Sequence, residues 1–325
     1  MSTASKSISR LTAGMMKPAS GALVRVWAYP SISVPLALWT DVGIRAESSC
    51  RTLVTGDQGR VPPEPVVHWV DGGSGPALVL LNGFTADGNT WPTDWVEELE
   101  RSYRVIRIDN RGSGRSSRSP APFRMADLAD DVAAVLDACG VDSAVILGLS
   151  MGGMIAQELA IRHPRRVKKL VLAATIPPVP MWVASDYGVT LAAQMTVPRP
   201  PVRGGEAAVA LEAGRRLLVF AASGFRVPDD RLREIGRQVL DNPTPARGAF
   251  AQARAINGWW NAARLASITA PTVVVHGLAD RVVPIANARR LAQLIPDIEV
   301  VEVADCGHMV PWEAPQSLLD AVANA

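Results

Sequence analysis

A serine stands among glycines at residues 147–153, where the sequence reads LGLSMGG. The segment follows an apolar run at 144–147 that has the length and composition of a buried strand, and the residues after it have helical apolar spacing. A G-x-S-x-G pattern between a strand and a helix is typical of a nucleophilic serine, because glycines permit the sharp turn that exposes the hydroxyl. The pattern is weak without that context. Its position makes Ser150 the candidate nucleophile.

A serine hydroxyl is a poor nucleophile unless a base removes its proton, and a third group must orient the base. Three of the four histidines have contexts that favour structural roles. His68 lies in an early predicted strand, His163 in the last turn of a helix before a proline, and His276 in a buried strand. His308 lies instead in the loop between the last predicted strand and the terminal helix, so it is the predicted base.

The acid that orients this histidine is predicted to be Asp280. It lies in the turn GLADRVVP after a strand, where its carboxylate can accept the second imidazole N–H. Asp305 is the alternative, but it is so close to His308 in the same loop that a loop-shaping role is favoured. The order along the chain is then nucleophile, acid, base.

A tetrahedral oxyanion needs two N–H donors held in place before the reaction. The amide of Met151, directly after the candidate nucleophile, is one. The second is predicted to be the amide of Phe84, in the segment NGFT that follows the apolar run 77–81. Gly83 lets this backbone come close to the site. Without Ser150, an ordinary strand-to-helix turn would be the better interpretation of this segment.

These side chains must be positioned by the elements around them. From residue 65 onward, short apolar runs alternate with amphipathic stretches, which is typical of a mostly parallel sheet with flanking helices. The predicted strands are 66–70, 77–81, 104–108, 144–147, 169–173, 271–275 and 298–303. The predicted helices are 125–139, 151–161, 284–294 and the segment after Pro315.

The alternation stops between residues 176 and 265, where proline clusters are followed by helix-like stretches at 206–219 and 230–240. An insertion at this point lies beyond the carboxyl ends of the strands, where open α/β sheets bind ligands, so we expect a helical cap. Its apolar side chains are candidates for a substrate pocket, although each could instead belong to the core of the cap. They are Met181, Trp182, Met195, Phe220, Phe225, Trp259 and Trp260, of which Trp182, Trp259 and Trp260 are the principal candidates.

The composition favours a small, largely neutral ligand. The 325 residues carry a net charge of +2, which gives no electrostatic bias toward nucleic acid. Cys50, Cys139 and Cys306 are too few and too widely spaced for a disulfide framework or a zinc site. We therefore expect no metal and a cytoplasmic location. Homo-oligomerisation stays possible.

Residues 1–60 are expected to form a flexible extension, 61–175 and 266–325 the α/β core, and 176–265 the cap. The apolar stretch 21–39 is interrupted by Arg25, Pro30 and Pro35, so it is a poor membrane span. Firm membrane association is not expected. Targeting or surface association through this segment is the alternative.

Four motifs in order resemble the α/β-hydrolase superfamily from about residue 66 to the carboxyl terminus: DNRGSGRS at 109–116, LGLSMGG, HGLADRVVP from His276 and DCGHMVPWEAP from Asp305. The resemblance implies an eight-stranded sheet with a cap after its sixth strand. It also implies a triad of Ser150, Asp280 and His308. The segments GLSMGGMIAQELA and DNRGSGRS are most similar to carboxylesterases and enol-lactone hydrolases. In DNRGSGRS we expect structural roles for Asp109, Arg111 and Ser116.

The chain departs from many relatives at Asn82, where they have histidine, which puts the orientation of the oxyanion loop in question. The expected reaction is cleavage of a small apolar ester or lactone through an acyl-enzyme on Ser150, without an organic cofactor. A serine at this position disfavours the aspartate-dependent dehalogenases and epoxide hydrolases. Carbon–carbon hydrolases, perhydrolases and acyltransferases with the same triad are alternatives, as is a hydrolase fold retained for ligand binding alone.

Overall fold

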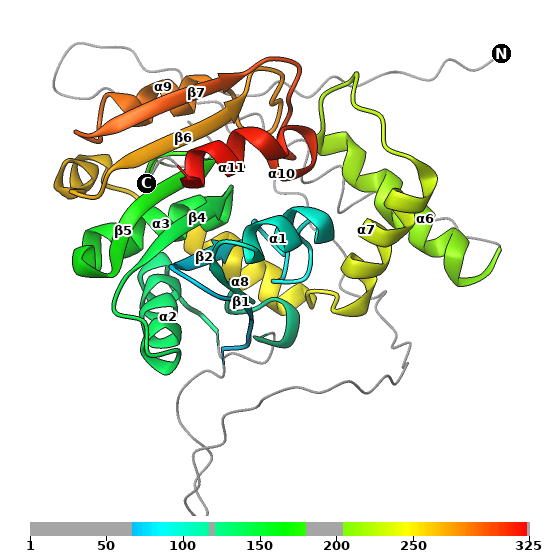
Figure 1. Ribbon diagram of the computed structural model, residues 1–325, viewed down its shortest axis with the longest axis horizontal. Helices are drawn as coiled ribbons and strands as arrows, with labels where there is room; N and C mark the ends of the chain where they lie inside the picture. The colour runs from blue at the N-terminus through cyan, green and yellow to red at the C-terminus, as the bar shows by residue number, and fades with distance from the viewer. Residues whose placement is uncertain (1–66, 117–120, 180–203, 324–325) are drawn as a thin grey trace, which may run out of the picture. The chain divides into compact units, whose positions relative to one another are not determined.

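The computed structural model describes residues 67–116, 121–179 and 204–323, all within one compact unit that spans Arg60–Ala325 (Figure 1). The predicted extension at 1–60 lies outside the described residues, as does Trp182. Within the described ranges, none of the helices has the length and apolar composition needed to cross a bilayer.

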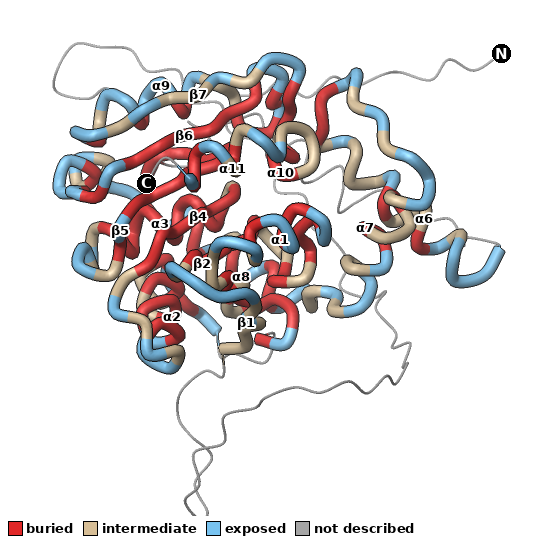
Figure 2. The backbone as a smooth tube through the Cα atoms, viewed as in Figure 1, coloured by how far each residue is buried: buried red, intermediate tan, exposed pale blue. Residues whose placement is uncertain are grey.

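One sheet forms the centre of the described unit. Its seven strands lie in the order β1-β3-β2-β4-β5-β6-β7, with β1 antiparallel to β3 and all other neighbours parallel. Parallel strands covered on both faces are apolar along their whole length, and β4 and β6 are accordingly buried at every position (Figure 2). The strands are β1 Trp69–Gly73, β2 Ala77–Leu81, β3 Arg104–Ile108, β4 Ala144–Leu149, β5 Val167–Ala173, β6 Thr272–Gly277 and β7 Ile298–Val303.

The α/β class with a mostly parallel sheet is confirmed, but the expected number of eight strands is wrong for the residues described. The chain enters the sheet at β1, which already lies at the edge and pairs only with β3. A strand before β1 would have to lie among residues that the structure does not describe. Among the described strands, the long insertion follows β5, the fifth.

Helices cover both faces of the sheet. Alternate strand residues divide between two apolar clusters: Val79 and Leu81 of β2 pack with one set of helices, and Leu78 and Leu80 with the other. The first set is α2 Met125–Ala138, α3 Met151–Arg162 and α9 Ala286–Ala292. The second is α1 Thr93–Glu100, α10 Val310–Glu313 and α11 Pro315–Ala323. The helices thus fix the strands whose carboxyl ends carry the candidate site.

The described part of the insertion between β5 and β6 is helical or irregular and contains no strand. It comprises α6 Gly205–Leu217, α7 Asp229–Asp241, α8 Ala246–Asn257 and two 3₁₀ segments at Leu218–Phe220 and Ala262–Ser267. Helices α6 and α7 approach closely because Gly214 and Gly236 lack side chains: a Cβ at either position would overlap a backbone carbonyl of the other helix. Helix α8 instead contributes Ala251, Ala255 and Ile256 to the core beneath the sheet.

Candidate active site

Ser150 occupies a strained turn between β4 and α3, with φ of 54° and ψ of −116°. The turn depends on two glycines: a Cβ at Gly148 would overlap the carbonyl of Gly152, and a Cβ at Gly152 would overlap that of Leu81. Hydrogen bonds hold the strained residue, since its N–H donates to Ala173 O at 2.8 Å and its carbonyl accepts from Thr175 Oγ1 at 2.7 Å. Such local strain persists only where the surroundings enforce it, as they do here.

His308 and Asp280 are in direct contact. The Nδ1 atom of His308 lies 2.8 Å from Oδ2 of Asp280. The other carboxylate oxygen of Asp280 accepts the N–H groups of Val282 and Val283, both at 2.8 Å. The acid is 6% exposed, so its orientation is fixed by buried contacts. Within the described part of the chain, Nε2 of His308 has no hydrogen-bond partner.

The topology explains why these residues meet. Asp280 follows β6 and His308 follows β7, and adjacent parallel strands bring their carboxyl ends to the same edge. Ser150 follows β4 at that edge of the sheet. Among the described residues, no hydrogen bond joins the Ser150 hydroxyl to His308. Catalytic hydrogen bonds are often long without substrate, and they tighten in the reacting complex.

The predicted oxyanion donors flank Ser150. Met151 is the first residue of α3, at the positive end of that helix. Phe84 follows Gly83, where a Cβ would lie 3.5 Å from Ser150 Cβ, so the loop after β2 packs against Ser150. Within the described ranges, neither the Met151 N–H nor the Phe84 N–H donates a hydrogen bond to the protein. Both amides are therefore available to a ligand oxygen.

Asn82 determines the shape of that loop. Its Oδ1 accepts the Gly83 N–H at 2.8 Å, while its Nδ2 donates to Asp87 O and to Thr90 Oγ1, each at 3.0 Å. The side chain is 2% exposed. The Asn82 side chain thus holds the backbone of this loop through buried hydrogen bonds.

The loop that carries His308 is held by Glu313, which the sequence analysis did not single out. One carboxylate oxygen of Glu313 accepts the N–H groups of Gly307, at 2.9 Å, and Ala222, at 2.8 Å. The other accepts the Met309 N–H at 2.9 Å. The only signal for Glu313 in the sequence is its place inside DCGHMVPWEAP.

Phe220 of the insertion also contacts this loop. Its carbonyl accepts the His308 N–H at 2.8 Å, and the two rings have centroids 6.4 Å apart. Phe220 was one of several apolar candidates, and it gives the surroundings of His308 an aromatic side chain.

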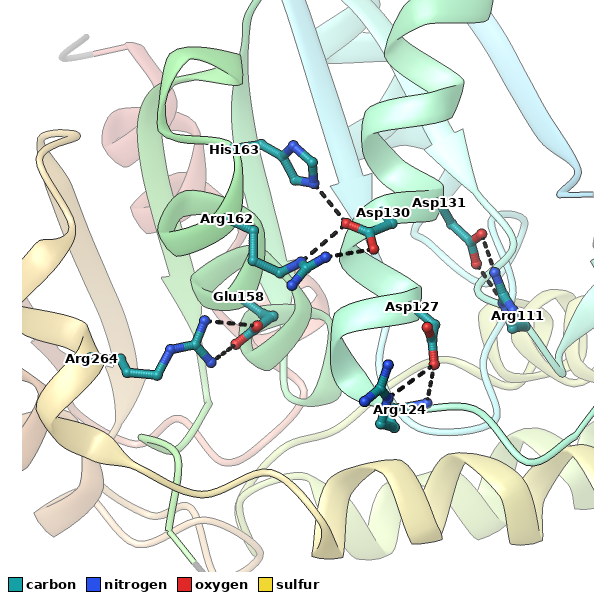
Figure 3. A network of polar contacts seen from close by, with 9 residues as sticks. All are labelled: Arg111, Arg124, Asp127, Asp130, Asp131, Glu158, Arg162, His163 and Arg264. Carbon is teal, nitrogen blue, oxygen red and sulfur yellow. Dashed lines mark hydrogen bonds and ion pairs between the residues drawn. The ribbon is translucent and has the colours of Figure 1, made fainter.

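The principal tryptophan candidates have different surroundings. Trp259 is 5% exposed, and its indole N–H donates to Glu158 Oε2 at 3.0 Å. Arg264 pairs with the same carboxylate (Figure 3). Trp259 therefore joins the insertion to α3. Glu158 lies two turns along α3 from Ser150, or about 12 Å away. Trp260 is 65% exposed. Contact of either side chain with a substrate stays a prediction.

The other histidines all have structural partners. Nδ1 of His68 lies 3.1 Å from Asp109, and Nε2 of His163 lies 2.7 Å from Asp130 (Figure 3). His276 Nε2–H donates to Val283 O at 2.7 Å, and burial lowers the pKa of this imidazole.

Residues of the DNRGSGRS segment hold loops near the site. Asp109 accepts the N–H groups of Gly88 and Arg115. Arg111 pairs with Asp131 of α2 (Figure 3). The Ser116 hydroxyl accepts the His68 N–H at 2.8 Å.

Cys306 lies two residues before His308, but it is not a competing nucleophile. Burial raises the pKa of its thiol to about 12, so the reactive thiolate is scarce at neutral pH.

The chain is similar in sequence and fold to known hydrolases. Rhodomycin D methylesterase DauP of Streptomyces sp. (strain C5) is 29% identical over 299 residues, covering 81% of this chain and 95% of that protein. The 2-hydroxymuconate semialdehyde hydrolase of Pseudomonas putida is 29% identical over 278 residues, covering 82% of this chain and 88% of that protein. The structure of Est816, an N-acyl homoserine lactone degrading enzyme, matches with a TM-score of 0.62 and 29% identity, covering 79% of this chain and 96% of Est816. Residues 76–315 match the family model described as alpha/beta hydrolase fold. The chain therefore belongs to the alpha/beta hydrolase family.

Proposed function

We propose that the protein is a serine hydrolase that cleaves a small apolar carboxylic ester or lactone through an acyl-enzyme on Ser150. The observation that carries this proposal is the 2.8 Å contact between His308 Nδ1 and the buried Asp280, at the sheet edge where Ser150 occupies its strained turn. An oriented imidazole and a serine hydroxyl that the substrate can reach are the two parts that acyl transfer requires.

In the first half of the reaction, His308 Nε2 takes the proton of the Ser150 hydroxyl as Oγ bonds to the carbonyl carbon. The carbonyl oxygen becomes an oxyanion, which accepts hydrogen bonds from the Met151 and Phe84 amides. When the carbonyl re-forms, the bond to the alcohol oxygen breaks and that oxygen takes the proton from His308. In a lactone, the freed hydroxyl stays attached to the acyl group.

In the second half, His308 takes a proton from water as the water oxygen attacks the acyl-enzyme. Collapse of the second tetrahedral intermediate breaks the bond to Ser150 Oγ, which recovers its proton, and the carboxylic acid leaves. Asp280 keeps the imidazole in the tautomer with hydrogen on Nδ1 and stabilises the imidazolium, without taking the proton itself.

The relatives support hydrolysis, and the substrates that their names give differ from one another. One is a methylesterase, and a structural relative degrades N-acyl homoserine lactones. An apolar substrate is favoured because the Phe220 ring lies beside His308. The 2-hydroxymuconate semialdehyde hydrolase favours carbon–carbon bond hydrolysis as the second candidate.

The test is a panel of p-nitrophenyl esters of increasing acyl length, N-acyl homoserine lactones, an enol-lactone and a vinylogous 1,5-diketone. Wild type is expected to turn over at least one ester or lactone, with Ser150→Ala inactive on it. Turnover confined to the diketone would replace the proposal by the carbon–carbon hydrolase. Equal ester turnover by wild type and Ser150→Ala would reject the serine mechanism.

A further inference from the structure

Gln252, on α8 of the insertion, joins two loops at the carboxyl edge of the sheet. Its side chain is fully buried. The Oε1 atom accepts the Thr85 N–H at 2.9 Å, and Nε2 donates to the Arg111 carbonyl at 3.0 Å. Both ends of one amide are therefore committed to backbone groups of the core.

Helix α8 is docked closely enough to make this bridge rigid. A Cβ at Gly248 would overlap the carbonyl of Gly112, so the helix and the loop after β3 touch backbone to backbone. Gln252 lies one turn further along the same helix and reaches the adjoining Arg111. The close contact between α8 and the loop after β3 thus fixes the position of Gln252 relative to that loop.

Thr85 has an unusual backbone that the insertion holds in place. Its φ of 62° lies in the left-handed region, which a β-branched residue rarely adopts. Two residues of the insertion satisfy its peptide groups: Gln252 accepts its N–H, and Thr244 Oγ1 donates to its carbonyl at 2.8 Å. A conformation of this kind persists only when neighbours enforce it.

The amide of Phe84 lies between two anchored peptide groups. On the amino-terminal side, Asn82 accepts the Gly83 N–H. On the carboxyl-terminal side, the planar peptide from Phe84 to Thr85 is fixed at both ends, because Gln252 accepts the Thr85 N–H and Thr85 Oγ1 donates to Phe84 O at 2.7 Å. The backbone of Phe84 is therefore set by one residue of the core and one of the insertion.

We propose that Gln252 is a positioning residue that holds the Phe84 amide in place for the oxyanion, so that the insertion takes part in stabilising the transition state. This inference rests on the proposed function, because it assigns Phe84 as an oxyanion donor. Gln252 itself touches no reacting atom. It acts through the Thr85 backbone.

The central variant is Gln252→Leu, which keeps the approximate size of the side chain and removes both hydrogen bonds. Because loss of one oxyanion donor lowers kcat by about 10² to 10³, a misplaced donor is expected to lower kcat by roughly 10- to 100-fold. KM should change by less than about threefold, because the donor acts mainly on charge that develops in the transition state.

Gln238→Leu on α7 is the matched control. Gln238 also reaches from the insertion to the core, where its Nε2 lies 3.2 Å from Thr93 Oγ1 and 3.4 Å from Trp91 O. These partners belong to the segment at the start of α1 and not to the oxyanion loop. Its kcat and KM are expected to stay within about twofold of wild type, because the half-buried Gln238 makes its hydrogen bonds away from the oxyanion loop.

Inhibition by a trifluoromethyl ketone that carries the acyl chain of the best ester is the second readout. A general loosening of the protein would not weaken this inhibition in step with kcat/KM. Ser150 adds to this ketone to form a tetrahedral oxyanion. Its inhibition constant should weaken by the same factor as kcat/KM in Gln252→Leu, and stay constant in Gln238→Leu. An unchanged inhibition constant, or a loss of activity confined to KM, would overturn the proposal.

Thr244→Val keeps the test decisive if Gln252→Leu does not fold. It removes only the hydroxyl that donates to the Thr85 carbonyl. The expected loss of kcat is about 3- to 10-fold, with a parallel change in ketone inhibition, and wild-type values for both would overturn the proposal. Failure of the proposed function is distinguishable, because wild type would then show no turnover dependent on Ser150.

Discussion

Asp280 is placed to orient His308, and the loop also offers Asp305 as a rival acid. Asp280→Asn places an amide where the carboxylate faces Nδ1, which favours the wrong imidazole tautomer. We expect kcat to fall by about 10³ to 10⁴, while KM changes little. Steady-state kinetics on the best ester of the panel measure both constants.

Asp305→Asn is the companion variant. Asp305 is exposed and has a φ of 52°, a region that asparagine tolerates well. Its kcat is expected to stay within about threefold of wild type, as is usual for a surface position. If this variant lost as much activity as Asp280→Asn, the two aspartates would have to exchange roles.

Asp87, in the loop after β2, is predicted to make stability depend on pH. It is 2% exposed, and burial, followed by the nearby Asp109, raises its pKa to about 6 from an ordinary value of 3.8. The folded state therefore binds this proton more tightly than the unfolded state does. The stability that Asp87 contributes is greatest at low pH and falls as pH rises toward and through about 6.

Asp87→Asn removes this ionisation. Relative to wild type, its free energy of unfolding should rise by about 2 kcal/mol between pH 4.5 and 7.5. Urea unfolding across that range measures the difference, with Asp142→Asn, at an exposed position, as a control for the loss of one carboxylate. A flat difference for Asp87→Asn would contradict a raised pKa.

The candidate triad can be predicted from the sequence because each member lies in a short contiguous motif that follows an apolar strand. The residues that hold these motifs in place cannot be predicted from the sequence in this way. Gln252 meets Thr85 across 167 positions of the chain, and Glu313 meets Ala222 across 91. A buried glutamine on an amphipathic helix has no sequence pattern that separates it from a solvated one.

The turn between β4 and α3 depends on the absence of a side chain at Gly152. A Cβ there would overlap the Leu81 carbonyl, so Gly152→Ala forces β2, the strand that carries Leu81, away from α3. We expect a loss of about 1–3 kcal/mol in the free energy of unfolding, measured in urea, together with reduced activity. Gly224→Ala is the control, because a Cβ there has open space. Equal stability of the two variants would contradict the close packing of the turn.

Elements were predictable where burial dictates composition. The predicted strands at 77–81, 104–108 and 298–303 coincide with β2, β3 and β7, and β4 to β6 differ only near their ends. β1 begins at Trp69, later than the predicted 66–70. The apolar run at 66–70 overlaps this edge strand only at its first two residues, and the remaining three, DGG, are not apolar.

Three of the described helices escaped prediction: the four-residue α10, and α1 and α8, which did so for different physical reasons. Helix α1 is only eight residues long and follows Pro92, so its apolar spacing covers two turns. Helix α8 contains Gly248, which lowers helix propensity but permits the close contact with Gly112. A requirement of tertiary packing thus overrides local preference in the helix that carries Gln252.

The insertion is tied to the core at several separate places, which include the His308 loop, the Thr85 loop and Glu158 of α3. Glu158 is the last of these places. Its side chain is only 2% exposed, and its carboxylate lies 3.0 Å from the guanidinium of Arg264 (Figure 3). Such anchoring favours an insertion that unfolds together with the sheet. If the insertion unfolded separately from the sheet, loss of one of these contacts would change the free energy of unfolding of the sheet little.

Arg264→Ala tests this anchoring. It leaves a buried carboxylate with only the Trp259 N–H, and because Arg264 is itself 37% exposed we expect a moderate loss of about 1–3 kcal/mol. Arg254→Ala, at an exposed position of α8, is the control, with an expected change below about 0.5 kcal/mol. Urea unfolding that showed no difference between the two variants would mean that Glu158 does not anchor the insertion.

The covalent intermediate on Ser150 is the central claim. Wild type treated with a fluorophosphonate should gain one adduct, and peptide mass spectrometry should locate it on the peptide that contains LGLSMGG. Ser150→Ala should gain none, and Asp280→Asn should react on the same peptide but more slowly. An adduct of equal yield in Ser150→Ala, or one located elsewhere in wild type, would contradict the assignment of the nucleophile.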